Sequence, residues 1–262
     1  ADKEMESLIN DLVDFQIGGI GFQTSGSSAI TRACRIARAV TSRNKIALIA
    51  DFWHGSEDPF LFRRDYELLS EGLVLTPNEN YVWYSSVENF LEFAKLEDFA
   101  GILIEPRQGS DPSKDMLKTF IDNTNRNLLQ EKGVILILDE IITAFREVYG
   151  SNNSSRKCDP DIVVFGKAVA GGYPTGMVLV KDSVSLLAKN KNIFWGGTFA
   201  GNPWQLKLIE DQLKKLRNLD FNIIKANLIS ITKYFSNHID LNKFEHQLSQ
   251  GGGFARILPS EK

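Results

Sequence analysis

Short apolar runs that end on a charged or small residue recur along this chain. The two clearest are 134–138, which is followed by Asp139, and 162–165, which is followed after one glycine by Lys167. Apolar runs of this length, bounded by glycine and charge, are typical of strands buried on both faces of a parallel sheet. Similar runs predict further strands at 20–23, 45–50, 73–75, 81–84, 100–104 and 177–180.

Segments with helical spacing alternate with these strands. In 27–40, Ile30 and Cys34 fall on one side of a helix, while Arg32 and Arg38 fall on the side predicted to face solvent. Other helices are expected at 5–15, 86–96, 112–132, 184–188, from 202 onward and at 220–238. The alternation favours an α/β fold with a mostly parallel central sheet and helices on both of its faces.

Asp139 and Lys167 each follow the end of a predicted strand. Ligands of open α/β sheets bind beyond the carboxyl ends of the strands, so both side chains are expected to point into one crevice. A carboxylate and an amine in one dry site suit pyridoxal phosphate, because the lysine forms a Schiff base and the carboxylate keeps the ring nitrogen protonated. The alternative is a buried ion pair that only joins two strands.

A second candidate feature is the small, hydroxyl-rich start of the helix at 27–40. Gly26, Ser27 and Ser28 would offer free backbone amides and hydroxyls, which is the pattern of an anion site at a helix N-terminus. The same residue types also begin many helices simply as caps. The pattern alone leaves both interpretations open.

Composition narrows the class of protein. The 262 residues carry a formal net charge of −3 without a basic patch, so nucleic acid is not expected as a partner. No apolar run approaches the roughly 20 residues that cross a bilayer, and the first residues lack a signal-peptide pattern. Two cysteines and three scattered histidines lack the spacing of a disulfide framework or a zinc site. We therefore expect a soluble, cytoplasmic protein without a membrane or metal partner.

Two long segments, LILDEIITAFR and DPDIVVFGKAVAGGYPTG, resemble the core of the class III aminotransferases, which are PLP-dependent transferases of fold type I. The resemblance is nearest to the branch that contains glutamate-1-semialdehyde 2,1-aminomutase. It implies that Asp139 pairs with the pyridine nitrogen, that Ile141 packs on one face of the ring and that Lys167 is the Schiff-base lysine. DFWHG resembles the family's YHG, which implies that Trp53 stacks on the ring.

The resemblance also implies a phosphate site. TSGSSA stands where the family has NSGTEA, so Gly26, Ser27 and Ser28 would hold the phosphate, although Ser28 replaces a glutamate whose contribution is left open. GTFAGNP resembles GTLSGNP, in which the Gly-Thr pair reaches across a dimer interface. The resemblance therefore implies a homodimer with shared active sites, to which Thr198 would contribute.

The matching motifs extend over about 20–216. The resemblance implies that 1–262 is a PLP-binding large domain that lacks the family's N-terminal segment and most of its C-terminal small domain. Two further residues stay open: Glu105 either borders the site or makes a structural hydrogen bond, and His54 is expected to be a structural neighbour without a catalytic partner.

Ile142 favours one chemistry within the family. Ordinary ω-aminotransferases usually carry glutamine at this position, whereas the aminomutase branch has an apolar residue. The favoured hypothesis is an isomerase that shifts an amino group within a semialdehyde through Lys167. The alternatives are a class III aminotransferase of a natural-product or surface-sugar pathway, which would act on amino and keto substrates, and a truncated, non-catalytic module.

Overall fold

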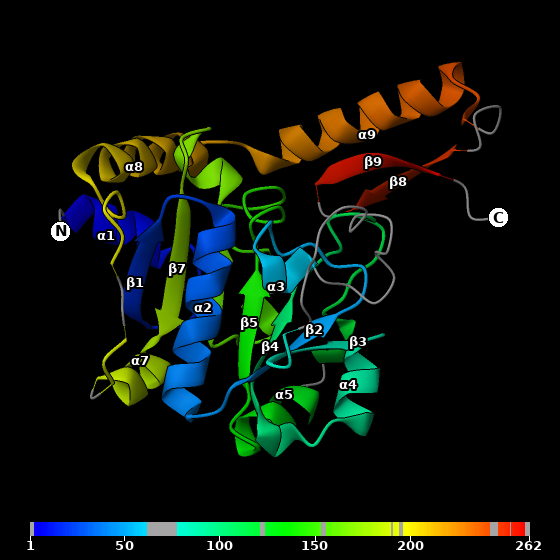
Figure 1. The fold of residues 1–262 in the computed structure, drawn as a ribbon. Helices are drawn as coiled ribbons and strands as arrows, with labels where there is room; N and C mark the ends of the chain where they lie inside the picture. Colours follow the sequence, from blue (N-terminus) through cyan, green and yellow to red (C-terminus); the bar gives the residue numbers. More distant parts are fainter. Residues whose placement is uncertain are drawn as a thin grey trace.

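The computed structural model describes residues 3–61, 78–120, 124–152, 156–189, 191–193, 196–241, 246–251 and 253–259. Within these residues the centre of the molecule is a seven-stranded sheet in the order β1-β7-β6-β5-β4-β2-β3 (Figure 1). Its strands are β1 (Ile17–Gln23), β2 (Lys45–Ile49), β3 (Tyr81–Tyr84), β4 (Phe99–Ile104), β5 (Ile135–Asp139), β6 (Ile162–Phe165) and β7 (Gly176–Lys181). The strand expected at 73–75 lies outside the described residues.

The sheet is mostly parallel, as the sequence predicts. The five neighbours from β6 to β3 run parallel to one another, while β7 is antiparallel to both β6 and β1. The carboxyl ends of β5 and β6 therefore lie at the same edge of the sheet. Asp139 is the last residue of β5, and Lys167 begins the 3-10 turn η3 (Lys167–Ala170) just after β6.

Helices cover both faces of this sheet. The helices α2 (Gly26–Thr41), α3 (Asp58–Leu61) and α7 (Asp182–Ala188) contribute to the core on one face. The helices α1 (Lys3–Asn10), α4 (Val87–Phe93), α5 (Thr124–Glu131) and α8 (Pro203–Arg217) contribute to the core on the other. Along β5, Ile135 and Ile137 face the first layer and Leu136 and Leu138 the second, which explains why an uninterrupted apolar run was needed there.

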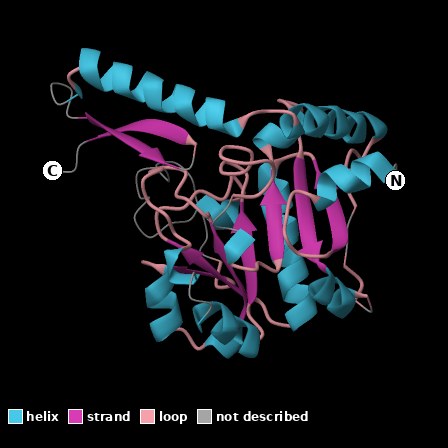
Figure 2. Cartoon of the chain, turned by 180° about the vertical axis from the view of Figure 1, so that it is seen from behind, coloured by secondary structure: helices cyan, strands magenta, loops and turns pink. Residues whose placement is uncertain are grey.

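A long helix and a hairpin extend beyond the sheet. The helix α9 (Phe221–His238) lies beside the two strands β8 (His246–Gly251) and β9 (Phe254–Pro259), on the side of the molecule away from α1 in both views (Figures 1 and 2). The turn of the hairpin is seated on the body of the protein: a Cβ at Gly251 would overlap the carbonyl oxygen of Pro112, and a Cβ at Gly253 would overlap that of Arg146. The hairpin therefore approaches the carboxyl edge of the sheet.

The long helix predicted at 112–132 is wrong in its first part. The described residues form only the 3-10 turn η2 (Lys118–Phe120) and then α5. Aspartate side chains accept hydrogen bonds from backbone amides that a helix would use. The amide of Ser113 donates to Asp111 Oδ1 at 3.2 Å, and the amide of Leu117 donates to Asp115 Oδ1 at 3.1 Å. Such local side-chain hydrogen bonds compete with helix formation.

The helix α2 differs from its prediction on its polar side. Arg32 is 2 % exposed rather than solvated, and its Nη2 donates to the carbonyl of Gly196 at 3.2 Å. The guanidinium of Arg38 stacks over the ring of Tyr81 with 4.5 Å to the centroid. Helical spacing identified the apolar face correctly, but the neighbouring segments that cover these arginines come from distant parts of the chain.

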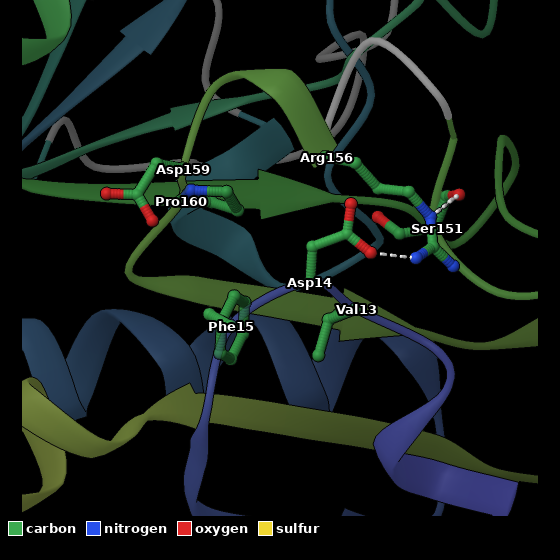
Figure 3. A pocket seen from close by; sticks show the side chains of 7 residues that line it. All are labelled: Val13, Asp14, Phe15, Ser151, Arg156, Asp159 and Pro160. Carbon is green, nitrogen blue, oxygen red and sulfur yellow. Dashed lines mark hydrogen bonds and ion pairs between the residues drawn. The ribbon is translucent and has the colours of Figure 1, made fainter.

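Arg156 fastens the N-terminal segment to the loop that follows β5. It forms an ion pair with Asp14 and donates through Nε to the carbonyl of Ser151 (Figure 3). Its Nη2 also donates to the carbonyls of Leu12 and Tyr149. A cavity of about 30 Å³ lies between these segments. The hydrogen bonds and ion pair of Arg156 hold these segments together, so the region has a structural role.

Candidate active site

The side chains predicted to do the chemistry line one pocket at the carboxyl edge of the sheet. This pocket has a volume of about 150 Å³. Its lining consists of Gly26, Ser27, Trp53, Gly55, Glu105, Asp139, Ile141, Ile142 and Lys167. An amine and a carboxylate supplied by two neighbouring parallel strands thus face the same space. The structure brings six of the eight predicted site residues together here; Ser28 and Thr198 are the two that it does not.

Lys167 presents its amine to this pocket from a constrained backbone. Its φ of 41° lies in the left-handed region, which few residues other than glycine adopt. Burial in the pocket lowers the pKa of the amine, Asp139 and Glu105 raise it, and Arg146 and Arg256 lower it further. The net direction is downward, so the neutral, nucleophilic form is reached at lower pH than in a free lysine.

Asp139 is held by two hydrogen bonds. Its Oδ1 accepts from the amide of Ile141 at 3.1 Å, and its Oδ2 lies 2.9 Å from Nδ1 of His54. Asp139 is 3 % exposed and His54 1 % exposed. His54 is a buried, hydrogen-bonded neighbour of the site, as expected, but its partner is the Asp139 carboxylate, 85 positions away in the chain, which the sequence did not identify. The only indication in the sequence that His54 belongs to the site was its position in the loop after β2.

Glu105 combines the two roles that the sequence left open. It lines the pocket, and its Oε2 accepts from the amides of Trp53 at 3.2 Å and Gly109 at 3.3 Å. The carboxylate is almost fully buried. It therefore fixes the backbone of the loop that carries Trp53, and its charge also acts on the Lys167 amine.

The start of α2 forms a cradle of small residues. Ser25 is the N-cap, and it exchanges hydrogen bonds with Ser28 in a capping box. The first amides of a helix have no partner within it, so those of Gly26 and Ser27 are available to an anion. Ser28 does not line the pocket, and its amide and hydroxyl are both engaged with Ser25. The hydroxyl of Ser28 accepts a hydrogen bond from the amide of Ser25, which is the bond that a glutamate side chain at the same helical position can also accept.

Ser27 is fixed from the opposite wall. Its Oγ accepts from the amide of Ser56 at 3.1 Å. Gly55, with φ of 102°, packs so closely that a Cβ there would overlap Ser27 Oγ. The loop after β2 and the start of α2 therefore form a single surface.

Ile141 and Ile142 form the apolar part of the lining. A Cβ at Gly26 would lie 2.7 Å from Cδ1 of Ile141, and one at Gly166 would lie 3.1 Å from its Cγ2. A Cβ at Gly109 would lie 2.7 Å from Cδ1 of Ile142. Glycines on three segments thus make room for these two branched side chains.

Thr198 lies outside the pocket of its own chain. It is exposed, and the neighbouring Phe199 and Trp204 are 67 % and 74 % exposed. Trp204 belongs to the first turn of α8, which is capped by the side chain of Asn202 at 3.0 Å from the amide of Gln205, with Pro203 at the first helical position. An exposed pair of large aromatic side chains therefore accompanies the predicted phosphate-binding threonine.

Comparison with known sequences decides the family. A family model described as aminotransferase class-III matches residues 68–248. The chain belongs to this family.

The curated relatives of this class III family member include two glutamate-1-semialdehyde 2,1-aminomutases. The protein of Fusobacterium nucleatum is 30% identical over 209 residues, which cover 76% of this chain and 48% of the relative. That of Thermoplasma volcanium is 27% identical over 252 residues, which cover 90% of this chain and 59% of the relative. The chain thus spans about half to three fifths of the length of these relatives.

Solved structures share the fold. An ω-transaminase from Sphaerobacter thermophilus superposes with a TM-score of 0.77 at 21% identity, covering 99% of this chain and 63% of the other. A taurine:2-oxoglutarate aminotransferase from Bifidobacterium kashiwanohense, solved with PLP and glutamate, gives 0.78 at 18% identity, with 97% and 63% covered. The predicted fold class is confirmed. In the described part of the chain, no helix has the length and hydropathy needed to cross a bilayer.

Proposed function

We propose that this class III family member binds pyridoxal phosphate and moves an amino group as glutamate-1-semialdehyde 2,1-aminomutases do. The observation that carries the proposal is that the Lys167 amine and the Asp139 carboxylate line one pocket. The pocket also contains the residues that the rest of this cofactor needs: small residues at a helix N-terminus for a phosphate, and Trp53 and Ile141 for the two faces of a ring.

Each residue has a defined part in this proposal. Bound pyridoxal phosphate supplies an electron-withdrawing ring that stabilises negative charge at the carbon of the attached amine. Asp139, fixed by His54 and by the amide of Ile141, keeps a proton on the ring nitrogen. Lys167 attaches the cofactor and, as a neutral amine, accepts and returns a proton at the substrate carbon. Its lowered pKa favours that neutral state.

The aminomutase form of the reaction is favoured by two observations. The two relatives described above carry that name, at 30% and 27% identity. The pocket wall at Ile142 is apolar and offers no amide to a ring hydroxyl. The proposed substrate is a semialdehyde that bears its own amino group, so that no second donor is required. A class III aminotransferase, which needs a separate donor and acceptor, is the alternative.

Two measurements test the proposal in sequence. Soaking the purified chain with pyridoxal phosphate is expected to produce visible absorbance that Lys167→Ala abolishes and that borohydride changes in the wild type. Absence of that absorbance would favour a non-catalytic module. Product formation from glutamate-1-semialdehyde is then followed with and without an amino donor. Turnover that depends on the donor would contradict the aminomutase assignment and favour the aminotransferase.

We also propose that two copies share their active sites, with Thr198 of each reaching the other. The exposed positions of Thr198, Phe199 and Trp204 support this arrangement. Sedimentation of the chain is expected to give a dimer that Trp204→Asp weakens. Mixing Lys167→Ala with Thr198→Val should restore cofactor binding in one of the two sites; a monomer with full cofactor affinity would contradict the proposal. The cytoplasmic location and the large-domain extent of 1–262 stay predictions.

A further inference from the structure

A second and larger cavity lies at the opposite edge of the sheet from Lys167. It has a volume of about 340 Å³, whereas the Lys167 pocket has about 150 Å³. It is found where β5 begins, between the ends of α2 and α5 and the helix α7, in the lower part of Figure 1. Among the residues that the structure describes, the two cavities share no lining residue. The amino edge of the sheet therefore carries a cavity that the reaction proposed for Lys167 does not use.

The walls of this cavity are mostly apolar. Val134, Ile135 and Val184 are buried and form its inner surface. Val40 is half-buried, and Leu187, which is 60 % exposed, stands at the rim. A cavity of this size with apolar walls and a few polar groups is typical of sites for small molecules. The apolar body of a ligand would be removed from water there, which favours binding.

Arg43 brings a fixed cation to this apolar cavity. Its Nη1 donates to the carbonyl oxygens of Lys132 at 2.9 Å, Phe99 at 3.0 Å and Gly133 at 3.3 Å. Within the described residues, the other terminal nitrogen, Nη2, has no hydrogen-bond partner. A Cβ at Gly133 would lie 3.4 Å from Nη2, so this nitrogen lies beside a glycine of the lining. One end of the guanidinium is thus anchored, and the other is available to a ligand.

The other two charged side chains of the lining already have partners. Lys181 forms an ion pair with Asp159. Asp161 forms an ion pair with Arg126 at 2.7 Å. In the part of the chain that the structure describes, Arg43 forms no ion pair with a carboxylate, so its charge is left for a ligand. The two nearby aspartates would repel a dianion more strongly than a monoanion, which favours a single negative charge on that ligand.

We propose that this cavity binds an organic monocarboxylate with an apolar body. The carboxylate accepts a charge-assisted hydrogen bond from Nη2 of Arg43, and the body packs on Val134, Ile135 and Val184. An uncharged apolar molecule would gain nothing from the guanidinium, and a phosphate would bring a second negative charge to the aspartates. The site goes beyond the proposed function and is independent of it, because it shares no lining residue with the cofactor pocket.

The test compares octanoate with octan-1-ol and with acetate on the full chain. Octan-1-ol has the same number of carbons without the charge, and acetate has the charge without the apolar body. Dissociation constants are measured by saturation-transfer NMR, in which the ligand signals report binding. Octanoate is expected to bind roughly tenfold more tightly than octan-1-ol, which is the size of one hydrogen bond to a charged group. Acetate is expected to show no measurable binding.

Two substitutions locate the site. Arg43→Gln removes the charge and should abolish most of the preference for octanoate over octan-1-ol, while Arg43→Lys should retain part of it. Ser183→Trp places a large ring in the lining from an exposed position and should weaken the binding of both probes. Circular dichroism checks that each variant is folded. If Arg43→Gln does not fold, Ser183→Trp decides the test.

Arg256→Gln is the matched control. Arg256 is also an exposed arginine, and it lines an apolar cavity of about 230 Å³ between α9 and the hairpin. Its replacement should leave the affinity for octanoate unchanged. A loss of affinity in this control would place the carboxylate in the other cavity and would contradict the proposal.

Further results would overturn the proposed site. These are equal affinity for octanoate and octan-1-ol in the wild type, a preference that survives in Arg43→Gln, and full affinity in Ser183→Trp. Sedimentation tests a second copy of the chain as the alternative occupant. Dissociation of a dimer by both Ser183→Trp and octanoate would make the cavity an interface between copies rather than a ligand site.

Cofactor absorbance, measured on the same variants, separates this site from the proposed function. It is expected to match the wild type in Arg43→Gln and Ser183→Trp. If the absorbance depends on Lys167 but octanoate is not preferred, the carboxylate site is wrong and the proposed function stands. If octanoate is preferred through Arg43 while no absorbance forms, the carboxylate site stands and the cofactor proposal fails.

Discussion

The imidazole Nδ1 of His54 lies 2.9 Å from Oδ2 of Asp139, in a position almost fully shielded from solvent. The second carboxylate oxygen accepts from the backbone of Ile141. Asp139 is thereby oriented from both sides before any ligand arrives. A carboxylate that contacts a ring nitrogen has to be held in one orientation, and these two hydrogen bonds hold it.

Replacing His54 tests this support. His54→Ala leaves Asp139 with one hydrogen bond, so we expect roughly tenfold weaker binding of pyridoxal phosphate, measured by absorbance titration. His54→Asn keeps a donor near the position of Nδ1 and should retain most of the affinity. Equal affinity in the alanine variant and the wild type would show that the contact has no part in cofactor binding.

The pH dependence of Lys167 follows from its surroundings. Because burial lowers its pKa, attachment of pyridoxal phosphate should reach half of its maximal rate below the ordinary lysine pKa of about 10.4. Glu105 raises the pKa of the amine, so Glu105→Gln should move this midpoint to still lower pH. Stopped-flow absorbance over a range of pH gives the midpoint. A shift to higher pH in Glu105→Gln would contradict the assigned sign.

The capping box of α2 should contribute to stability and to cofactor binding together. Ser25→Ala removes the N-cap acceptor of Ser28 and is expected to lower the free energy of unfolding by about 1 kcal/mol. Ser86→Ala removes the corresponding cap of α4 and should cost a similar amount. Denaturant unfolding measures both. Only Ser25→Ala should also weaken cofactor binding, since α4 contributes no residue to the pocket lining.

Two glycines with the same φ allow the effect of backbone strain to be separated from that of a steric contact. Gly55 and Gly172 both have φ of 102°, but a Cβ at Gly55 would overlap Ser27 Oγ, whereas one at Gly172 would meet nothing within 4 Å. Alanine at either position should cost about 1 kcal/mol of stability from the left-handed backbone. Gly55→Ala alone should displace Ser27 and reduce cofactor affinity, measured by absorbance titration. Equal loss of affinity in both variants would contradict this account.

Sequence and structure contributed different parts of the candidate site. Buried strands of a parallel sheet are uninterrupted apolar runs, and their carboxyl ends share one edge of the sheet. The position of Asp139 and Lys167 in one pocket was therefore predictable from two short segments. The capping box of Ser25 and Ser28 is also local, since it is closed within four residues, but the sequence pattern left open whether this helix start binds an anion or only caps the helix.

Only the tertiary structure decided the contacts between distant segments. Helical periodicity identified the apolar face of α2, but it could not show that the segment at Gly196 covers Arg32. Helix propensity at 112–132 did not account for the hydrogen bonds that the side chains of Asp111 and Asp115 accept from the backbone. The partner of His54 and the contact of the hairpin turn with Arg146 depend on how loops and the hairpin pack. Local sequence determines strands, caps and chain direction, whereas the position of a charge beside another is fixed by packing across the whole chain.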